Sequence, residues 1–475
     1  MPLNILYNQT MNNFDFSTFI SPFTWRYGSD EMRKVFSEKH KYELWRRIWV
    51  ALAEAENQTG LVSKEELADL KKYEKDIDIE KIFELEKETK HDVVAAIKEY
   101  AEKAKIGGGK IHLGATSMDV VDNTDLIKIM EAFEIVEKKV VIILKLLSDK
   151  IEQYSDFPCL GYTHLQPAEP TTVGYRLSFY AQDLLTAYET IQFVKKIIKG
   201  KGMKGAVGTG ASYNALLKDS KMTVSELEEK VMKSLGIEAA LITGQVYPRL
   251  FDFMVLNSLT MVTAALAKFA GDLRILQSPL YGEWSEPFGK KQVGSSAMPF
   301  KKNPINSENI CSLSRFVAQL PNVAIENASL SYLERTLDDS ANKRLIIAEG
   351  FLATDQILDT AEKIINGLII NKERISFNLD QYAPFVASEL ILMETVKNGA
   401  DRQEIHEVLR NISMTAWAEI QKGKTNPMIQ LLMSDKLIGH YLNIDQLEKL
   451  LSVKTHIGDA PERAKKIVKI IKNFI

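Results

Sequence analysis

The sequence predicts an all-α protein built around a long central bundle of helices. Apolar residues recur at intervals of three and four from 126 to 151, which is the period of one long amphipathic helix, and strand-like alternation is not sustained anywhere. Residues 251–277 are apolar on almost every face, as in a helix buried inside a bundle. No proline interrupts 23–157, 171–247 or 322–383, so helices in these stretches can run long.

Three structural units are expected along the chain, because its 475 residues exceed one ordinary compact domain. Residues 1–115 carry shorter helices and a break at Gly107-Gly108-Gly109, residues 116–370 carry the long helices, and residues 371–475 form a third helical unit. The helix at 251–277 is so apolar that it needs many neighbours, which partner subunits of an assembled bundle can supply.

Composition narrows the class of protein. Hydrophobic residues make up 45% and charged residues 26%, as in soluble globular chains, and the net charge of -3 gives no general attraction to nucleic acid or membrane lipid. The apolar run 140–147 is cut by Lys145, so we expect no membrane span, and residues 1–10 show no secretory signal. Two distant cysteines, Cys159 and Cys311, fit a reducing cytoplasm better than a disulfide framework.

The segment from Pro279 to Pro304 departs from the helical pattern. Glycine, serine and proline are concentrated there, and long loops inside compact folds are usually functional or disordered. It also carries four lysines, with no acidic residue from 289 to 307. Such a loop could close over a multiply charged anion.

Five stretches of sequence together resemble a known family. In order along the chain they are Glu88-Thr-Lys-His-Asp-Val-Val94, Gly114-Ala-Thr-Ser-Met-Asp-Val-Val-Asp-Asn123, Gly161-Tyr-Thr-His-Leu-Gln-Pro167, Gly294-Ser-Ser-Ala-Met-Pro-Phe-Lys-Lys-Asn-Pro304 and Glu334-Arg-Thr-Leu-Asp-Asp-Ser-Ala-Asn-Lys-Arg344. The fourth resembles the signature GSSxMPxKxNP of the fumarase/aspartase superfamily. Taken together, the five are similar to the adenylosuccinate lyase family within it.

The resemblance implies a β-elimination that releases fumarate from a succinylated nucleotide, adenylosuccinate or the related imidazole-carboxamide nucleotide. Ser295 matches the general base and His164 the general acid, and an imidazole with a pKa near ~6.5 suits proton donation to a departing amine. His91 matches a second histidine that contacts the substrate and assists the acid. Alone, Ser295 would be read as a loop or capping serine, and each histidine as a hydrogen-bonded structural residue.

The carbanion of such a reaction needs preorganised donors aimed at the neighbouring carboxylate. Lys301 and Asn303 fit that role, whereas outside the motif they would be read as a solvated lysine and a turn residue. The resemblance implies that Glu308 orients His164, and the structural alternative is an exposed acid at a helix start.

Nucleotide recognition is expected from Arg335, Ser340 and Arg344. With Asp338 or Asp339 as N-cap, Ser340 and Arg344 share one helix face, and a helix amino terminus beside two guanidinium groups is a ready phosphate site. The alternative is surface salt bridging. By resemblance the following residues also bind substrate, although Asn309 stands where animal members carry arginine: Arg26, Tyr27, Lys90, Asp92, Thr116, Ser117, Gln245 and Asn309.

Other signals are weaker. Gly107-Gly108-Gly109-Lys110 lacks the spacing of a P-loop, and the glycines at 202, 205, 208 and 210 follow no clear strand, so neither is a nucleotide cradle. We expect no metal and no cofactor. The resemblance further implies a homotetramer whose active sites draw residues from more than one chain. Two alternatives stay open: another lyase of the superfamily, such as an argininosuccinate lyase, or a catalytically silent member of the fold.

Overall fold

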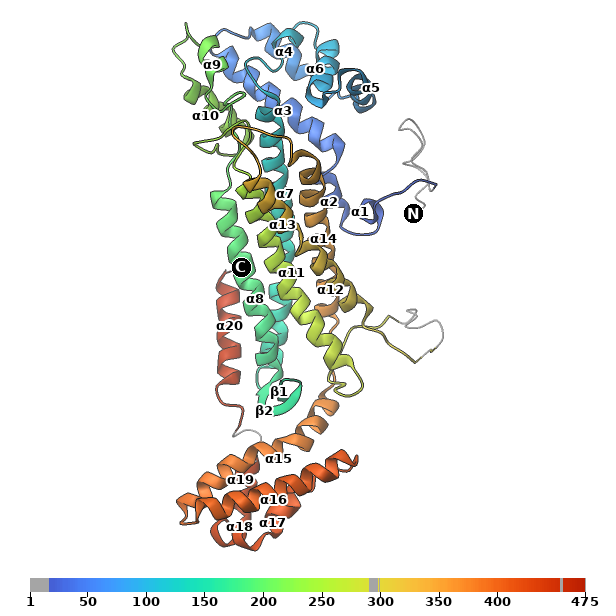
Figure 1. Cartoon of the computed structure of the whole chain (residues 1–475), viewed down its shortest axis with the longest axis vertical. Helices are drawn as coiled ribbons and strands as arrows, with labels where there is room; N and C mark the ends of the chain where they lie inside the picture. Colours follow the sequence, from blue (N-terminus) through green and yellow to red (C-terminus); the bar gives the residue numbers. More distant parts are fainter. Residues whose placement is uncertain (1–16, 290–297, 299, 453–455, 475) are drawn as a thin grey trace. The chain divides into compact units, whose positions relative to one another are not determined.

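A computed structural model describes residues 17–289, 298, 300–452 and 456–474. Within them the chain is mainly helical (Figure 1). Contacts between residues divide it into two compact units. Unit 1 comprises residues 1–139, 187–264 and 313–358, and unit 2 comprises 140–186, 265–312 and 359–475. These units do not coincide with 1–115, 116–370 and 371–475, and the latter division stays a prediction.

Five long helices carry residues of both units, and two of them contain the stretches whose apolar pattern predicted a long helix. They are α7 (Ser117–Gln153), α8 (Val173–Ile197), α11 (Leu250–Gln277), α12 (Ile305–Val317) and α14 (Ser340–Asn366). The amphipathic period at 126–151 and the apolar stretch at 251–277 therefore lie in α7 and α11, as expected. The apolar side chains that define the α11 pattern, from Leu256 to Phe269, are almost fully buried.

Helix α11 also bears on the expectation that no segment could cross a membrane. By length and composition alone it could do so, because one 18-residue window has a mean hydropathy of 1.6. Half of that window is buried inside the protein. The core helix of a soluble bundle passes the same test, so the finding is weak evidence for a membrane span.

Unit 1 also contains the shorter helices of the first third of the chain, together with α9, α10 and α13 from later in the sequence (Figure 1). Its core contains a row of four aromatic rings, Tyr42, Trp45, Trp49 and Tyr100. Each ring contacts the next one in an edge-on or tilted orientation. The elements are α1 (Pro22–Trp25), α2 (Asp30–Val35), α3 (Glu38–Asn57), α4 (Lys64–Tyr73), α5 (Ile79–Thr89), α6 (Asp92–Lys103), η1 (Gly108–Lys110), α9 (Ala211–Leu216), α10 (Val224–Leu235) and α13 (Leu320–Ser329).

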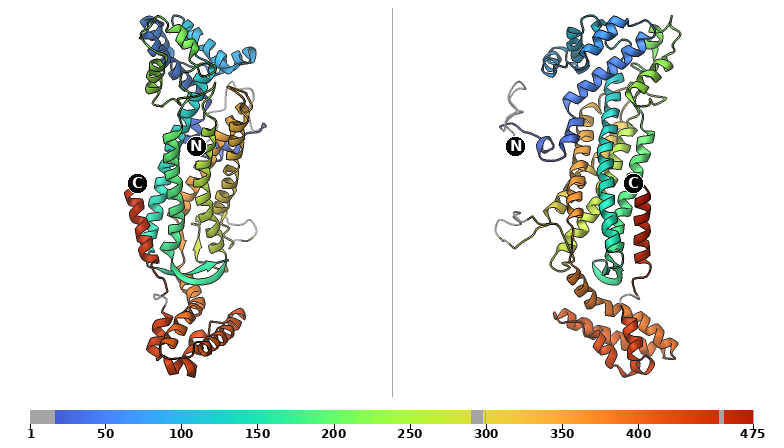
Figure 2. Two further views of the ribbon diagram at one scale, coloured as in Figure 1. Left: turned by 60° about the vertical axis from the view of Figure 1, so that its left-hand side comes forward. Right: turned by 180° about the vertical axis from the view of Figure 1, so that it is seen from behind.

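In unit 2 the last helix of the chain, α20, lies apart from a group of helices that pack around α15, as both views of Figure 2 show. Ala387, Ile405, Met428 and Ile438 are fully buried in their shared core. The elements are α15 (Lys372–Lys397), α16 (Arg402–Gln421), α17 (Met428–Ser434), α18 (Lys436–Tyr441), α19 (Ile444–Leu451) and α20 (Ala460–Phe474).

Unit 2 also contains strands, which the sequence pattern did not reveal. Strands β1 (Pro158–Thr163) and β2 (Gln166–Thr172) form an antiparallel hairpin, and β3 (Trp284–Ser285) pairs with β4 (Ile369–Ile370). Thr171 and Thr172 directly precede α8, which begins at Val173. Both lie in β2, but the Thr172 hydroxyl accepts the N–H of Tyr175 and so caps α8.

Candidate active site

A cavity of about 590 Å³ in unit 1 gathers most of the residues that the sequence assigned to substrate binding. Its wall draws on α5, α6, the start of α7, the segment before α11 and the start of α14, which are far apart in the sequence. The predicted residues that line it are Lys90, His91, Asp92, Thr116, Ser117, Gln245, Arg335, Ser340 and Arg344.

A tight break between two helices presents Lys90, His91 and Asp92 to the cavity. Helix α5 ends at Lys90, whose φ of 53° lies in the left-handed region, and His91 then adopts an extended conformation before α6 begins. A left-handed backbone is unfavourable for a lysine, and such strain concentrates at functional sites. The His91 side chain is 46% exposed, so its ring is accessible from the cavity.

His91 lies beside the first turn of α7. Its Nε2 is 3.5 Å from the hydroxyl oxygen of Ser117, and its Nδ1 is 3.5 Å from a carboxylate oxygen of Asp92. A histidine with a carboxylate at one nitrogen and a hydroxyl at the other can exchange protons with a ligand or hold a polar group of one. The Lys90 to Asp92 motif and the Thr116 to Ser117 motif therefore lie side by side in unit 1.

The expected phosphate residues lie at the amino terminus of α14, which begins at Ser340. Arg335 Nη1 donates to Asp339 at 2.5 Å, so the salt-bridge alternative holds for one of its nitrogens. Its Nε is buried without a hydrogen-bond partner among the described residues. Arg344 is exposed and makes only a long contact of 3.4 Å to Asp92. Donors for an anion thus remain available on both arginines.

Asp339, directly before α14, forms hydrogen bonds with two arginines, Arg335 and Arg249. Its carboxylate accepts from Arg335 and, at 2.6 Å, from Arg249 Nε. Burial alone would raise the pKa of Asp339, but the two guanidinium groups lower it below its usual value. The carboxylate therefore stays ionised and fixes Arg335 at the edge of the cavity.

Sequence reasoning missed a buried charged cluster in the same wall. Arg249 makes two hydrogen bonds of 3.1 Å to Asp122, and Lys343 donates to Asp125 at 2.8 Å. Burial and Arg249 act to lower the pKa of Lys343, but Asp125 and its other neighbours hold it well above the usual value. Asp122 stood inside a quoted motif, yet no local pattern pairs it with residues more than a hundred positions away.

In unit 2, His164 lies at the tip of the hairpin formed by β1 and β2. Thr163 pairs with Gln166, which leaves His164 and Leu165 as a two-residue turn with φ values of 54° and 59°. Turns of this kind favour Asn and Gly, so a His-Leu pair is strained. The Leu165 carbonyl accepts from the Tyr281 hydroxyl at 3.0 Å, which helps to hold the turn. His164 is exposed.

The remaining predicted residues of unit 2 lie around the start of α12. Glu308 is an exposed residue of its first turn, as the structural alternative stated, and no hydrogen bond or ion pair among the described residues joins it to His164. The carboxylate of Glu286 accepts the N–H groups of Asn306 and Ser307 and thereby satisfies the helix amino terminus. Around this start Lys301 is exposed, and Asn303 and Asn309 are half-buried.

Three predicted residues remain. Ser295 lies outside the described residues. Arg26 and Tyr27 belong to unit 1 but do not line the cavity, and the Arg26 guanidinium instead lies 5.6 Å from the centre of the Trp25 ring. Among the described residues, no group of three or more His, Cys, Asp or Glu side chains could hold a metal ion.

The fold and these motifs define a lyase. A family model described as "Lyase" matches residues 25–318, and one described as "Adenylosuccinate lyase C-terminus" matches 384–467. The solved structure of a 3-carboxy-cis,cis-muconate lactonizing enzyme from Pseudomonas putida shares the fold, with a TM-score of 0.83 and 19% identity, over 95% of this chain and 99% of that one.

Sequence relatives specify the family. Adenylosuccinate lyase of Saccharomyces cerevisiae is 37% identical over 96% of this chain and 95% of its own length, and that of Schistosoma mansoni is 39% identical over 89% and 88%. The chain belongs to the adenylosuccinate lyase family.

Proposed function

We propose that this protein eliminates fumarate from adenylosuccinate to give AMP, and from succinylaminoimidazole-carboxamide ribotide to give the imidazole-carboxamide ribotide. The observation that carries the proposal is the unit 1 cavity, which is lined both by His91 and by Arg335, Ser340 and Arg344. One side of the cavity offers proton-exchanging and polar groups and another offers positive charge. A substrate with a reacting succinyl group and a phosphate needs both.

The phosphate end of the substrate is assigned to the start of α14. Ser340 is the first residue of this 27-residue helix, and the amino terminus of a helix favours an anion. The partnerless Nε of Arg335 and the exposed guanidinium of Arg344 supply charge-assisted donors. Asn309, where animal relatives carry arginine, leaves more of this task to Arg335 and Arg344.

The elimination itself is assigned from the family motifs. Ser295, as an alkoxide, takes the proton from the carbon beside the carboxylate, and Lys301 and Asn303 stabilise the negative charge that spreads into that carboxylate. The carbon–nitrogen bond then breaks and His164 protonates the departing amine, with Glu308 orienting His164. Fumarate leaves with the electrons of the former carbon–hydrogen bond in its double bond. The reaction as written needs neither metal nor organic cofactor.

The same proposal includes the assembly and the setting of the enzyme. We assign it a homotetramer in which each active site takes His91, His164 and Ser295 from more than one chain, with Arg26 and Tyr27 contributing to substrate binding. The apolar face of the bundle supports association. The protein is placed in the cytoplasm, where its nucleotide substrates are made, with no nucleic-acid or membrane partner.

Comparison of two substrates tests the proposal. Purified protein is incubated with adenylosuccinate or with argininosuccinate at equal concentration, and fumarate is followed by its ultraviolet absorbance. Fumarate released with AMP from adenylosuccinate, and none from argininosuccinate, is the expected result. Release only from argininosuccinate would assign the chain to another lyase, and release from neither nucleotide nor argininosuccinate would make it a catalytically silent member of the fold.

A further inference from the structure

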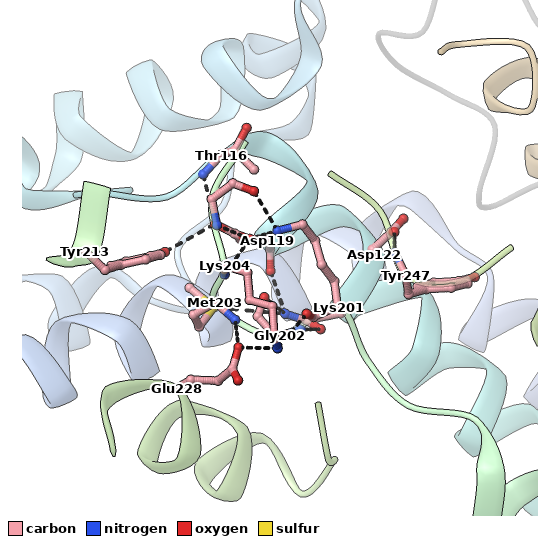
Figure 3. Close-up of polar contacts among 12 residues, drawn as sticks. Thr116, Asp119, Asp122, Lys201, Gly202, Met203, Lys204, Tyr213, Glu228 and Tyr247 are labelled. Carbon is pink, nitrogen blue, oxygen red and sulfur yellow. Dashed lines mark hydrogen bonds and ion pairs between the residues drawn. The ribbon is translucent and has the colours of Figure 1, made fainter. Parts of the chain in front are cut away.

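One carboxylate in unit 1 is surrounded by hydrogen-bond donors although it does not line the cavity. Asp119, in the first turn of α7, is fully buried, and its carboxylate accepts from the ammonium group of Lys201, which is also fully buried (Figure 3). The hydroxyl of Tyr213 lies 3.3 Å from the same group. Removing either charge would leave the other buried and unpaired, at a large energetic cost.

The donors come largely from a glycine-containing loop, residues 200–205. The backbone N–H groups of Lys204 and Gly205 point to Asp119 at 3.2 and 3.1 Å, and Lys201 belongs to the same loop. Gly202 and Gly205 both have positive φ, and a Cβ on Gly202 would meet a carboxylate oxygen of Glu228 at 2.1 Å. Successive backbone N–H groups of this kind form anion-binding nests. Here the bound anion is a side chain of the protein itself.

A second residue of α7 attaches the same loop. The side-chain amide of Asn123 donates to the carbonyl of Gly202 at 3.2 Å, and its oxygen accepts the Gly202 N–H at 3.1 Å. The loop therefore contacts α7 at two positions one turn apart. The backbone conformation at Gly202 and Gly205 therefore serves contacts within the protein, with the Asn123 side chain and the Asp119 carboxylate.

The other side of Asp119 faces the candidate active site. Its Oδ2 accepts the backbone N–H of Thr116 at 3.0 Å, and its own N–H donates to the Thr116 carbonyl at 2.9 Å. Because α7 begins at Ser117, this is the N3-to-N-cap half of a capping box. Thr116 and Ser117 line the cavity, and the Ser117 hydroxyl is the group 3.5 Å from His91 Nε2.

We propose that Asp119 and Lys201 are positioning residues of the reaction, which fix the Thr116–Ser117 turn against His91 and the substrate. The inference rests on the proposed function for its kinetic consequence. Neither side chain lines the cavity, so they act through the turn. An asparagine at 119 would keep the shape of the side chain. It would lose the charge that Lys201 requires and would turn an NH₂ group toward donors of the loop or of Thr116.

Glu228 provides a matched control on the same loop. Its carboxylate accepts from Lys204 Nζ at 2.7 Å and from the Met203 N–H at 2.8 Å, so it is also charged, paired and attached to residues 200–205. Within the part of the chain that the structure describes, it makes no hydrogen bond to Asp119 or Thr116. Glu228→Gln therefore loosens the far side of the loop while the carboxylate at the start of α7 keeps its donors.

The test compares Asp119→Asn, Lys201→Met, Lys201→Arg and Glu228→Gln with the wild type. Backbone hydrogen exchange of residues 114–120 is measured on the intact protein without substrate, and kcat and KM for adenylosuccinate are measured per folded site. We expect faster exchange at 114–120 and a loss of roughly 10- to 100-fold in kcat/KM, carried mainly by KM, for Asp119→Asn and Lys201→Met. Lys201→Arg keeps the charge and should restore most of both, and Glu228→Gln should change neither.

The exchange and kinetic results together decide whether Asp119 and Lys201 are positioning residues. Faster exchange at 114–120 with unchanged KM and kcat per folded site would make the pair purely structural and overturn the proposal. Unchanged exchange would overturn it as well, because the turn would then hold without the pair. If Lys201→Met does not fold, Lys201→Arg and Asp119→Asn carry the comparison. A wild type that does not act on adenylosuccinate defeats the proposed function, and the exchange data then decide by themselves whether the pair orders the turn.

Discussion

Glu56 offers a test of how burial governs the energetics of unit 1. It lies in the last turn of α3, is fully buried, and neither of its carboxylate oxygens has a hydrogen-bond partner among the described residues. Burial raises the pKa of Glu56 to about 8, with Lys110 opposing the shift. An isolated buried carboxylate is costly, so the folded protein holds this group protonated at neutral pH.

The pH dependence follows from the two states of the chain. Below pH ~4.5 the carboxyl group is protonated in both the folded and the unfolded chain, and it has no effect on stability. Between pH ~4.5 and about 8 the unfolded chain releases the proton and the folded chain keeps it, so stability falls as pH rises. At about 1.4 kcal/mol per pKa unit, the loss is about 3 kcal/mol at pH 7 and approaches roughly 5 kcal/mol above pH 8.

Replacement by glutamine removes this titration. Relative to the wild type, Glu56→Gln should gain stability as pH rises from 5 to 8.5, by roughly 3 to 5 kcal/mol per chain. The measurement is denaturant unfolding of both proteins at the two pH values, with Glu102→Gln on the exposed face of α6 as control. The difference between pH values cancels any constant cost of burying the amide. An equal offset at both pH values would show that Glu56 is ionised and paired in solution.

Three further predictions concern the candidate active site. Ser295→Ala should lower kcat by about 10²-fold or more while nucleotide binding persists, and retained turnover would remove it from the base role. Arg335→Ala and Arg344→Ala should each weaken binding of AMP by roughly 10- to 100-fold in calorimetry, and an equal loss for adenosine would refute the phosphate assignment. His91→Ala and Ser295→Ala proteins, refolded together, should regain roughly a quarter of the sites if each site takes these residues from different chains. No recovery from verified mixed tetramers would place both on one chain.

The long helices could be predicted because their signals are local. The spacing of apolar residues indicated the stretch within α7, and apolar residues on almost every face indicated α11. The hairpin of β1 and β2 could not be predicted, because Pro158, Pro167 and Pro170 interrupt any alternation over strands of only six and seven residues. Prolines are tolerated there because a two-stranded hairpin consists of edge strands.

The residues of the candidate site could be predicted where neighbouring residues of one sequence motif line the cavity together. The stretch around His91, the start of α7 and the start of α14 each carried a recognisable pattern, and the structure brings these three together in unit 1. The charged residues between them were missed. Arg249, for example, is held by Asp122 and Asp339, which are 127 and 90 positions away, so no window of sequence reports their contact.

The glycine-containing loop, residues 200–205, is a second case in which the contact partner is far away in the sequence. Gly202 and Gly205 were recognised only as glycines that do not form a nucleotide cradle, which left open what the backbone of their loop holds. The answer, Asp119, lies in another motif more than eighty positions earlier. Only the folded chain identifies the partner, because the nest and its carboxylate belong to separate elements.

The central claim is that the chain breaks the carbon–nitrogen bond of adenylosuccinate. The most direct measurement is a time course of purified wild-type protein with adenylosuccinate, in which AMP and fumarate are both quantified by chromatography and Ser295→Ala serves as the control. The account predicts that AMP and fumarate appear in equal amounts for the wild type and are nearly absent for the variant. Adenylosuccinate that remains intact, with a protein shown to be folded and able to bind AMP, would contradict it.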